Sequence, residues 1–197
     1  ISGAGGNIGA TYVSRAAPDG YTLLFHQLGM AISPFLYPKL EYDPLKSFEY
    51  IGLIAYQANV LVTRPKAMPE RFSEFLAYLK VNQEKLSFAS TGPGGASDLC
   101  AILFKSHTGL DIKTVPYRAT APALTDVIAG NVDLLCDSVA TATPYIQAGT
   151  VRAYGVTTTT RASSLPDVPT LDEQGLKGFD QTTWTALYAP KGTPAPV

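Results

Sequence analysis

The chain has 197 residues, and 46% of them are hydrophobic, which is enough to build one large or two small globular domains. Its net charge of −1, from 15 basic and 16 acidic residues, excludes a broad basic surface for nucleic acid or anionic membranes. No apolar run approaches the ~18 residues that a membrane-spanning helix needs.

The chain begins in a glycine-rich loop, residues 3–9, which leads into a helix predicted over 8–16. A loop of this kind normally follows a strand, so we expect a supporting strand before Ile1. The last residues, 192–197, stop where another loop would begin. The sequence therefore predicts a first lobe that is incomplete at both chain ends.

A turn at residues 18–20 precedes an apolar strand predicted over 21–25. His26 and Gln27 follow the carboxyl end of that strand, where α/β proteins place ligand-contacting loops. Both are candidate ligand contacts, although a single histidine at such a position is often only packed. Residues 34–48, punctuated by proline, are predicted to form an ordered surface connector.

The rest of the chain predicts an α/β fold in two parts. Residues 49–63 are long for one strand and are interrupted at 57–59, which suits a strand that leaves one sheet and enters another. Beyond Pro69 short strands and helices alternate, which predicts a parallel sheet covered on both faces. The strands are predicted over 86–89, 112–115, 132–136 and 151–157, and the helices over 70–80, 99–107, 122–129 and 144–148.

A second crossing between the two parts is expected near Thr157, where the alternation ends. A short helix over 170–175 and a strand over 182–189 would then complete the first part. Two crossings imply two lobes joined by two strands. The predicted first lobe contains residues 1–62 and 158–197, and the predicted second lobe contains residues 63–157.

The stretch Ser90 to Asp98, STGPGGASD, joins a predicted strand to a predicted helix and is a candidate anion cradle. Its glycines permit close approach by a ligand, and the unpaired N–H groups of the next helix attract a carboxylate or phosphate. Taken alone, the stretch could equally be a glycine-rich turn without a ligand. Similar openings at 3–9, 119–122 and 138–144 predict that several helix starts converge at one edge.

Neutral hydrogen-bond donors dominate these loops, so we expect a carboxylate to be held without an arginine clamp. Arg118 is the only cation beside them, and Ser97 is also expected to cap its helix. Asp137 leaves its predicted strand at the same edge. The expected donors are the backbone N–H groups of Gly95, Ala96 and Ala121 and the hydroxyl groups of Thr91, Ser97 and Thr120.

The cysteines, Cys100 and Cys136, have no metal-binding spacing, and the chain has only two histidines, so no metal site is expected. Both cysteines fall in the predicted second lobe. We expect two free, buried thiols. A disulfide is the alternative, provided that the two Cα atoms lie within about 7 Å of each other.

One enzyme class has to be weighed, because the glycines of residues 3–9 resemble the phosphate loop of extended short-chain dehydrogenases, which bind NAD(P). That family also needs a YxxxK pair, and the only match, Tyr42 with Lys46, contains Pro44 and lies in a connector. The strand over 21–25 lacks the acidic residue that would bind ribose. No GxSxG hydrolase motif occurs either. We therefore expect no catalytic residues and no cofactor.

Several blocks run in order along the chain and are specific together, although each is weak alone. They are GAGGNIGA, APDGYTLL, AISPFLYPKLEYDPLKSF, NVLV, FKSHTGLDIKTVPYR, APALTDVIAGNVDLLCD, LPDVPTLDEQGLKGF and LYAPKGTP. This set closely resembles the Bug family, the extracytoplasmic solute receptors of tripartite tricarboxylate transporters. The resemblance covers essentially the whole chain.

The resemblance implies a periplasmic-binding-protein fold, type II-like, in which two α/β lobes joined by two hinge strands close on a small carboxylate without catalysis. It implies a periplasmic location, membrane components of the transporter as partners, and another ligand loop before Ile1. A monomer is expected. An orphan receptor that acts in signalling remains an alternative. The positions that match ligand-binding positions of the family are Thr91, Gly95, Ser97, Thr120, Ala121 and Asp137.

The chain departs from the family pattern at His26 and Gln27, where small residues are usual. The resemblance therefore implies a pocket of different shape. Bulkier contacts at this place favour an aromatic, dicarboxylic or otherwise extended acid over a simple amino acid.

Overall fold

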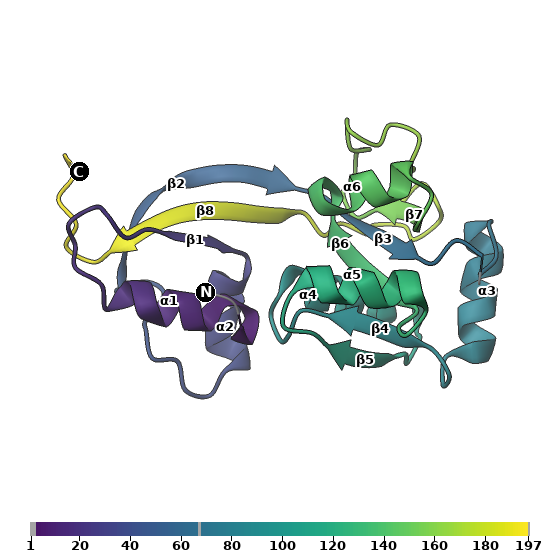
Figure 1. Ribbon diagram of the computed structural model, residues 1–197, viewed down its shortest axis with the longest axis horizontal. Coiled ribbons are helices and arrows are strands. Elements are labelled where there is room, and N and C mark those ends of the chain that lie inside the picture. The colour runs from purple at the N-terminus through teal and green to yellow at the C-terminus, as the bar shows by residue number, and fades with distance from the viewer. Residues whose placement is uncertain (1–2, 67, 197) are drawn as a thin grey trace.

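The computed structural model describes residues 3–66 and 68–196, so the strand and the ligand loop expected before Ile1 lie outside the described residues. The chain folds into two lobes that lie side by side and are connected by long strands (Figure 1). No helix among the described residues is long and apolar enough to cross a membrane. The α/β, two-lobe architecture predicted from the sequence is confirmed.

The first lobe is built on a three-stranded antiparallel sheet in the order β1-β8-β2. Its strands are β1 (Leu24–Gln27), β2 (Phe48–Gln57) and β8 (Thr183–Pro190). A 3-10 turn, η1 (Ala4–Gly6), leads into α1 (Asn7–Ser14), and α2 (Gly29–Leu36) follows β1. Ala10, Met30, Phe48 and Tyr188 are among the residues of its core.

The second lobe is built on a five-stranded sheet in the order β5-β4-β6-β3-β7. Strand β4 is parallel to β5 and β6, whereas β3 is antiparallel to both of its neighbours. The expected all-parallel sheet is therefore wrong at β3, because this strand enters directly from the other sheet rather than through a helical crossover. Its strands are β3 (Asn59–Thr63), β4 (Ser87–Ser90), β5 (Lys113–Pro116), β6 (Leu134–Ser138) and β7 (Arg152–Val156).

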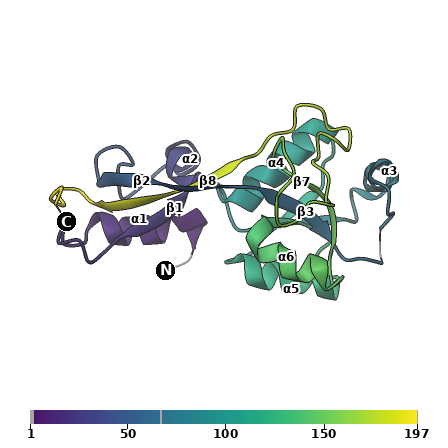
Figure 2. The same cartoon turned by 90° about the horizontal axis from the view of Figure 1, so that it is seen from above.

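Helices cover both faces of this sheet, as the sequence predicted, with α4 on one face and α5 and α6 on the other (Figure 2). Phe75, Phe88 and Phe104 pack in the core on the α4 side, and Leu124 and Val127 pack in the core on the α5 side. The helices are α3 (Phe72–Asn82), α4 (Ala96–Thr108), α5 (Thr120–Ala129) and α6 (Val139–Gln147).

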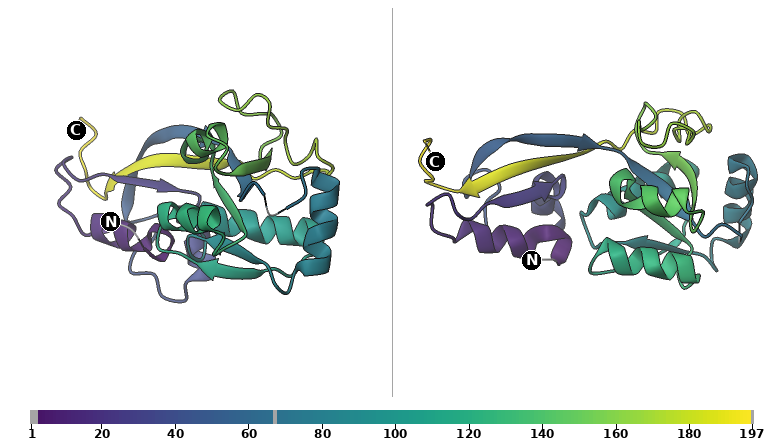
Figure 3. Two further views of the ribbon diagram at one scale, coloured as in Figure 1. Left: turned by 45° about the vertical axis from the view of Figure 1, so that its right-hand side comes forward. Right: turned by 45° about the horizontal axis from the view of Figure 1, so that its top comes forward.

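The lobes are joined by β2 continuing into β3 and by the chain that returns into β8, as two further views make clear (Figure 3). The interruption at Gln57–Asn59 marks the first crossing, as expected. The return comes later than the expected Thr157. Leu171 and Phe179 pack in the core of the second lobe, so the crossing lies between Gln181 and Thr183.

Several predicted element bounds need correction. Residues 170–175 form turns and an isolated bridge from Thr170 to Val156 rather than a helix. The sequence does not predict helix α2, because Pro34 lies inside it. Proline lacks an N–H and usually interrupts a helix. Helix α6 starts at Val139, so Pro144 is internal and not a first-turn residue.

The two cysteines form a disulfide, which corrects the expectation of free thiols. Cys100 lies on α4 and Cys136 on β6, and their Cα atoms are 6.2 Å apart. This separation is within bonding range because α4 packs against β6. The bond therefore ties the helix that follows the glycine-rich loop to the strand that leads to Asp137.

Candidate functional site

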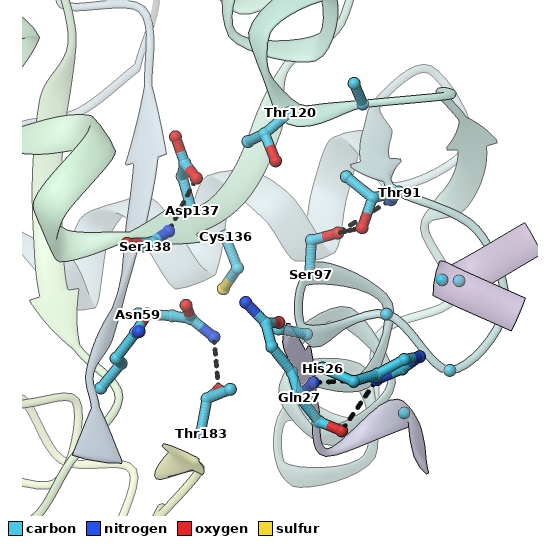
Figure 4. A pocket seen from close by; sticks show the side chains of 18 of the residues that line it. His26, Gln27, Asn59, Thr91, Ser97, Thr120, Cys136, Asp137, Ser138 and Thr183 are labelled. Carbon is cyan, nitrogen blue, oxygen red and sulfur yellow. Dashed lines mark hydrogen bonds between the residues drawn. The ribbon is translucent and has the colours of Figure 1, made fainter. Parts of the chain in front are cut away.

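A cavity of about 360 Å³ lies between the lobes, at the edge where strands end and helices begin (Figure 4). His26 and Gln27 line it from the first lobe, and Thr91, Thr120 and Asp137 line it from the second. The other lining residues are Gly3, Gly5, Gly6, Phe25, Gly29, Gln57, Asn59, Gly94, Gly95, Ala96, Ser97, Arg118, Ala119, Cys136, Ser138 and Thr183.

The cavity brings together all but one of the residues expected to contact a ligand. His26, Gln27, Thr91, Gly95, Ala96, Ser97, Thr120 and Asp137 line it, whereas Ala121 is an exposed residue that does not. Ala121 is the second residue of α5, one position beyond Thr120 at the cavity wall. Whether the lining residues bind a ligand stays a prediction.

Helix starts converge on the cavity, as the repeated glycine-rich openings predicted. The residues before or at the starts of α1, α2, α4, α5 and α6 all contribute to its wall. Each start presents N–H groups that have no partner within the helix, together with the positive end of the helix dipole. The cavity is therefore electrostatically suited to an anion without a cluster of basic side chains.

Side chains of the loop from Ser90 to Asp98 fix its shape. The Ser97 hydroxyl accepts the Thr91 N–H at 2.8 Å and lies 2.8 Å from Thr91 Oγ1. Asp98 accepts from the Ser90 hydroxyl at 2.9 Å and from the Gly94 N–H at 3.1 Å. Ser97 is thus inside the helix and holds the loop, rather than acting as the expected helix cap.

His26 is buried between the lobes and is uncharged at neutral pH. Its Nδ1 lies 2.8 Å from the Gln27 N–H, which donates to it, and its Nε2 has no hydrogen-bond partner among the described residues. Burial lowers the pKa of His26, and the Gln27 carbonyl oxygen, 3.1 Å from Nδ1, opposes that shift only in part because it favours a protonated ring. The imidazole ring of His26 therefore shapes this wall of the cavity without adding a positive charge.

Asp137 is the one acidic side chain in the described cavity wall. Its Oδ1 accepts the Ser138 N–H at 2.7 Å, and its Oδ2 is buried without a partner. Burial raises the pKa of Asp137 to about 6, and the Ser138 N–H opposes this rise. The carboxyl is therefore mostly ionised at neutral pH, although its surroundings disfavour the charge.

The crossing strands carry a buried polar network that the sequence does not predict. Asn59 Nδ2 donates to Gln181 Oε1 at 3.0 Å and to Thr183 Oγ1 at 3.2 Å. Gln181 Nε2 in turn donates to the Ala96 carbonyl at 3.1 Å. This network links the hinge to the start of α4. The only feature of the sequence that points to this network is the interruption at residues 57–59, because the hydrogen-bonded partners are far apart in the chain.

The lobes also touch at the rim of the cavity. Tyr37 Oη of the first lobe donates to the Pro93 carbonyl of the second at 2.9 Å. A Cβ atom at Gly5 would lie 2.6 Å from that same carbonyl oxygen, and one at Gly29 would lie 3.3 Å from the Gly94 carbonyl oxygen. The two backbones can therefore meet because these positions carry no side chain.

The described residues do not reproduce the motifs of the enzyme classes weighed above. Tyr42 is buried in the first-lobe core and donates to Asn7, and Lys46 pairs with Asp43 on the surface. Neither Tyr42 nor Lys46 lines the cavity between the lobes. No group of three metal-binding side chains occurs within 3–66 and 68–196.

Solved structures of similar sequence share this fold. The periplasmic binding protein BugD is 43% identical, with a TM-score of 0.95 over 99% of this chain and 65% of BugD. MatC (Rpa3494) from Rhodopseudomonas palustris, solved with bound malate, is 39% identical, with a TM-score of 0.90 over 98% of this chain and 66% of MatC. Rpa4515 from R. palustris, solved with adipate, is 32% identical, with a TM-score of 0.95 over 100% of this chain and 66% of Rpa4515.

The sequence also matches a family model along its whole length. Residues 1–197 fit the model described as "Tripartite tricarboxylate transporter family receptor". The chain spans less than two thirds of the curated relatives that it matches, 57% and 59% for two of them. Because the family model covers every residue and the fold is that of BugD, the chain belongs to the tripartite tricarboxylate transporter receptor family.

Proposed function

We propose that this chain forms the ligand-binding part of a receptor that captures a small organic acid between two lobes for uptake by a tripartite tricarboxylate transporter. The observation that carries the proposal is the convergence of helix starts and hydroxyl groups on one cavity. Relatives with the same fold hold malate and adipate, which are both dicarboxylates. The receptor would act in the periplasm, as a monomer, and without catalysis.

The two lobes would close on the acid and exclude water from it, which strengthens each polar contact. The boundaries between the lobes would lie near residues 58 and 182, rather than at the expected 62 and 157. This placement is supported by β3, which belongs to the sheet of the second lobe, and by the segment 158–180, which packs with that lobe. Ligand contacts would then come from both lobes and from the crossing strands.

A thermal-shift screen of the full-length protein tests this function. The panel contains mono- and dicarboxylates, including aromatic acids, together with sugars, amines, NAD(H) and NADP(H). We expect stabilisation by at least one organic acid and by no nucleotide, since binding to the folded state raises the melting temperature. Stabilisation only by sugars, amines or nucleotides would refute the proposal, and micromolar binding of NAD(H) would favour a dehydrogenase.

Neutral donors should matter more than the nearby cation. Thr120→Val removes a hydroxyl donor from the cavity wall and is expected to weaken binding of the selected acid by about tenfold. Arg118→Gln should weaken it by less than about threefold, because Arg118 is exposed and its charge is screened. Calorimetric titration of both variants gives the two ratios. Loss of binding in Arg118→Gln alone would show that an arginine clamp holds the acid.

The contact between Tyr37 and Pro93 should stabilise the closed lobes. Tyr37→Phe removes a hydrogen bond that crosses the rim, so we expect ligand affinity to fall about two- to fivefold. Tyr50→Phe is a matched control, because Tyr50 Oη donates to the Pro44 carbonyl at 2.7 Å within the first lobe. Calorimetry should find the affinity of that control unchanged. Equal losses in the two variants would mean that Tyr37 has no role in closure.

A further inference from the structure

Asp137 has a buried carboxyl oxygen that no hydrogen bond from the described residues satisfies. It ends β6, is 3% exposed and lines the cavity between the lobes. One carboxyl oxygen accepts the Ser138 N–H at 2.7 Å, while the other is buried and has no partner among the described residues. A buried acceptor without a donor is unfavourable, so the site is incomplete as it stands.

Three of the polar side chains in the surrounding walls, Asn59, Thr91 and Ser97, already have hydrogen-bond partners of their own. Asn59 donates to Gln181 and Thr183 across the hinge, and the Ser97 and Thr91 hydroxyls lie within hydrogen-bonding distance of each other. Arg118 lines the same cavity but makes no salt bridge with Asp137. None of the described residues donates to Asp137 Oδ2, so we expect the missing donor to come from the bound molecule.

The charge of Asp137 also limits which acids fit. A ligand that presents only carboxylates would bring like charges together in a cavity of low dielectric constant. A ligand that also carries a hydroxyl or ammonium group would pair that group with the Asp137 carboxylate, while the helix starts hold its own carboxylate. Burial raises the pKa of Asp137 to about 6, which is consistent with a carboxylate that lacks its donor.

Building on the proposed function, we infer that Asp137 is a specificity-determining residue that selects organic acids bearing a hydroxyl or ammonium donor beside a carboxylate. Hydroxy acids and amino acids both provide such a donor. The experiment below distinguishes between these two classes of ligand. The departure at His26 and Gln27 changes the shape of the opposite wall without supplying a charge that would neutralise Asp137.

The test compares acids that differ only in the donor. Calorimetry with the full-length protein at about pH 7.5 uses succinate, malate and aspartate, and the same series on five- and six-carbon chains. We expect at least one hydroxy or amino acid to bind about tenfold or more tightly than its unsubstituted parent. Preference for the hydroxy member identifies a hydroxy-acid receptor, and preference for the amino member identifies an amino-acid receptor.

Asp137→Asn provides the decisive variant because it keeps the side-chain shape and an oxygen for the Ser138 N–H, but replaces the second oxygen by a donor. The preference for the substituted acid should fall to less than about threefold. Asp133→Asn is the control, because Asp133 Oδ2 accepts from Ser87 N at 2.9 Å and lies outside the cavity wall. That variant should keep the preference of the natural sequence.

The outcomes distinguish this inference from the function on which it rests. If unsubstituted acids bind as tightly as their substituted relatives, or if Asp137→Asn keeps the preference, the inference is wrong while the receptor function stands. If no acid of any chain length binds and the wider panel also finds none, the proposed function fails, and the inference fails with it. The comparison of ligands on the natural sequence needs no variant, so a folding defect in Asp137→Asn would leave it decisive.

Discussion

Removing the disulfide between Cys100 and Cys136 is expected to lower the free energy of unfolding by about 4 kcal/mol. The bond closes a loop between residues 36 positions apart, and the loss of loop-closure entropy in the unfolded chain gives about this value. The bond also joins α4, whose start forms the cradle, to the strand that ends in Asp137. Reduction should therefore weaken ligand binding as well as stability.

Urea unfolding with and without reductant measures the stability effect, and serine variants identify its cause. Cys100→Ser, Cys136→Ser and the double variant should lose similar amounts, because either single change already removes the bond. Thiol titration of the unreduced protein in denaturant should find no reactive group. Two reactive thiols before reduction, or unfolding curves unaffected by reductant, would contradict the disulfide.

Asp137→Asn is expected to stabilise the protein near neutral pH, by up to about 3 kcal/mol, while it removes most of the preference for substituted acids. The pKa of Asp137 is raised from 3.8 to about 6, and each unit corresponds to about 1.4 kcal/mol. Between these values the folded state binds more protons than the unfolded state, so the natural protein loses stability as the pH rises. The loss is complete above about pH 6, where the buried group is ionised in both states.

The pH dependence separates this effect from any constant consequence of the substitution. Unfolding free energies of both proteins should be measured from about pH 4 to about pH 7.5. The advantage of Asp137→Asn should grow as the pH rises and level off above about pH 6. A difference between the two proteins that does not change with pH would mean that burial does not perturb this carboxyl.

Much of the site could be predicted from local sequence. Glycine-rich stretches between strand and helix have a restricted geometry, so the positions of Thr91, Gly95 and Thr120 at a shared edge followed from their places in the pattern. Rules that involve only neighbouring residues therefore located the loops of the site, although they failed for Pro34, which lies inside α2, and for Ser97, which does not cap α4.

Other failures involve contacts between distant parts of the chain. The sequence placed Cys100 and Cys136 in one lobe, but the packing of α4 on β6 decides that their sulfurs meet. The same limit hid the network of Asn59 with Gln181 and Thr183, whose members are 122 and 124 positions from Asn59. Periodicity also could not show that β3 runs against its neighbours, because strand direction leaves no trace in a short apolar run.

The most direct test of carboxylate capture is a pair of calorimetric titrations of the full-length protein. One uses the organic acid that stabilises it best, and the other uses the same molecule with its carboxylates converted to primary amides. The helix starts and charge-assisted hydrogen bonds recognise the negative charge, so we expect micromolar binding of the acid and about a hundredfold or greater loss for the amide. An amide that binds within about threefold of the acid would contradict the account, because the cavity would then not be recognising a carboxylate.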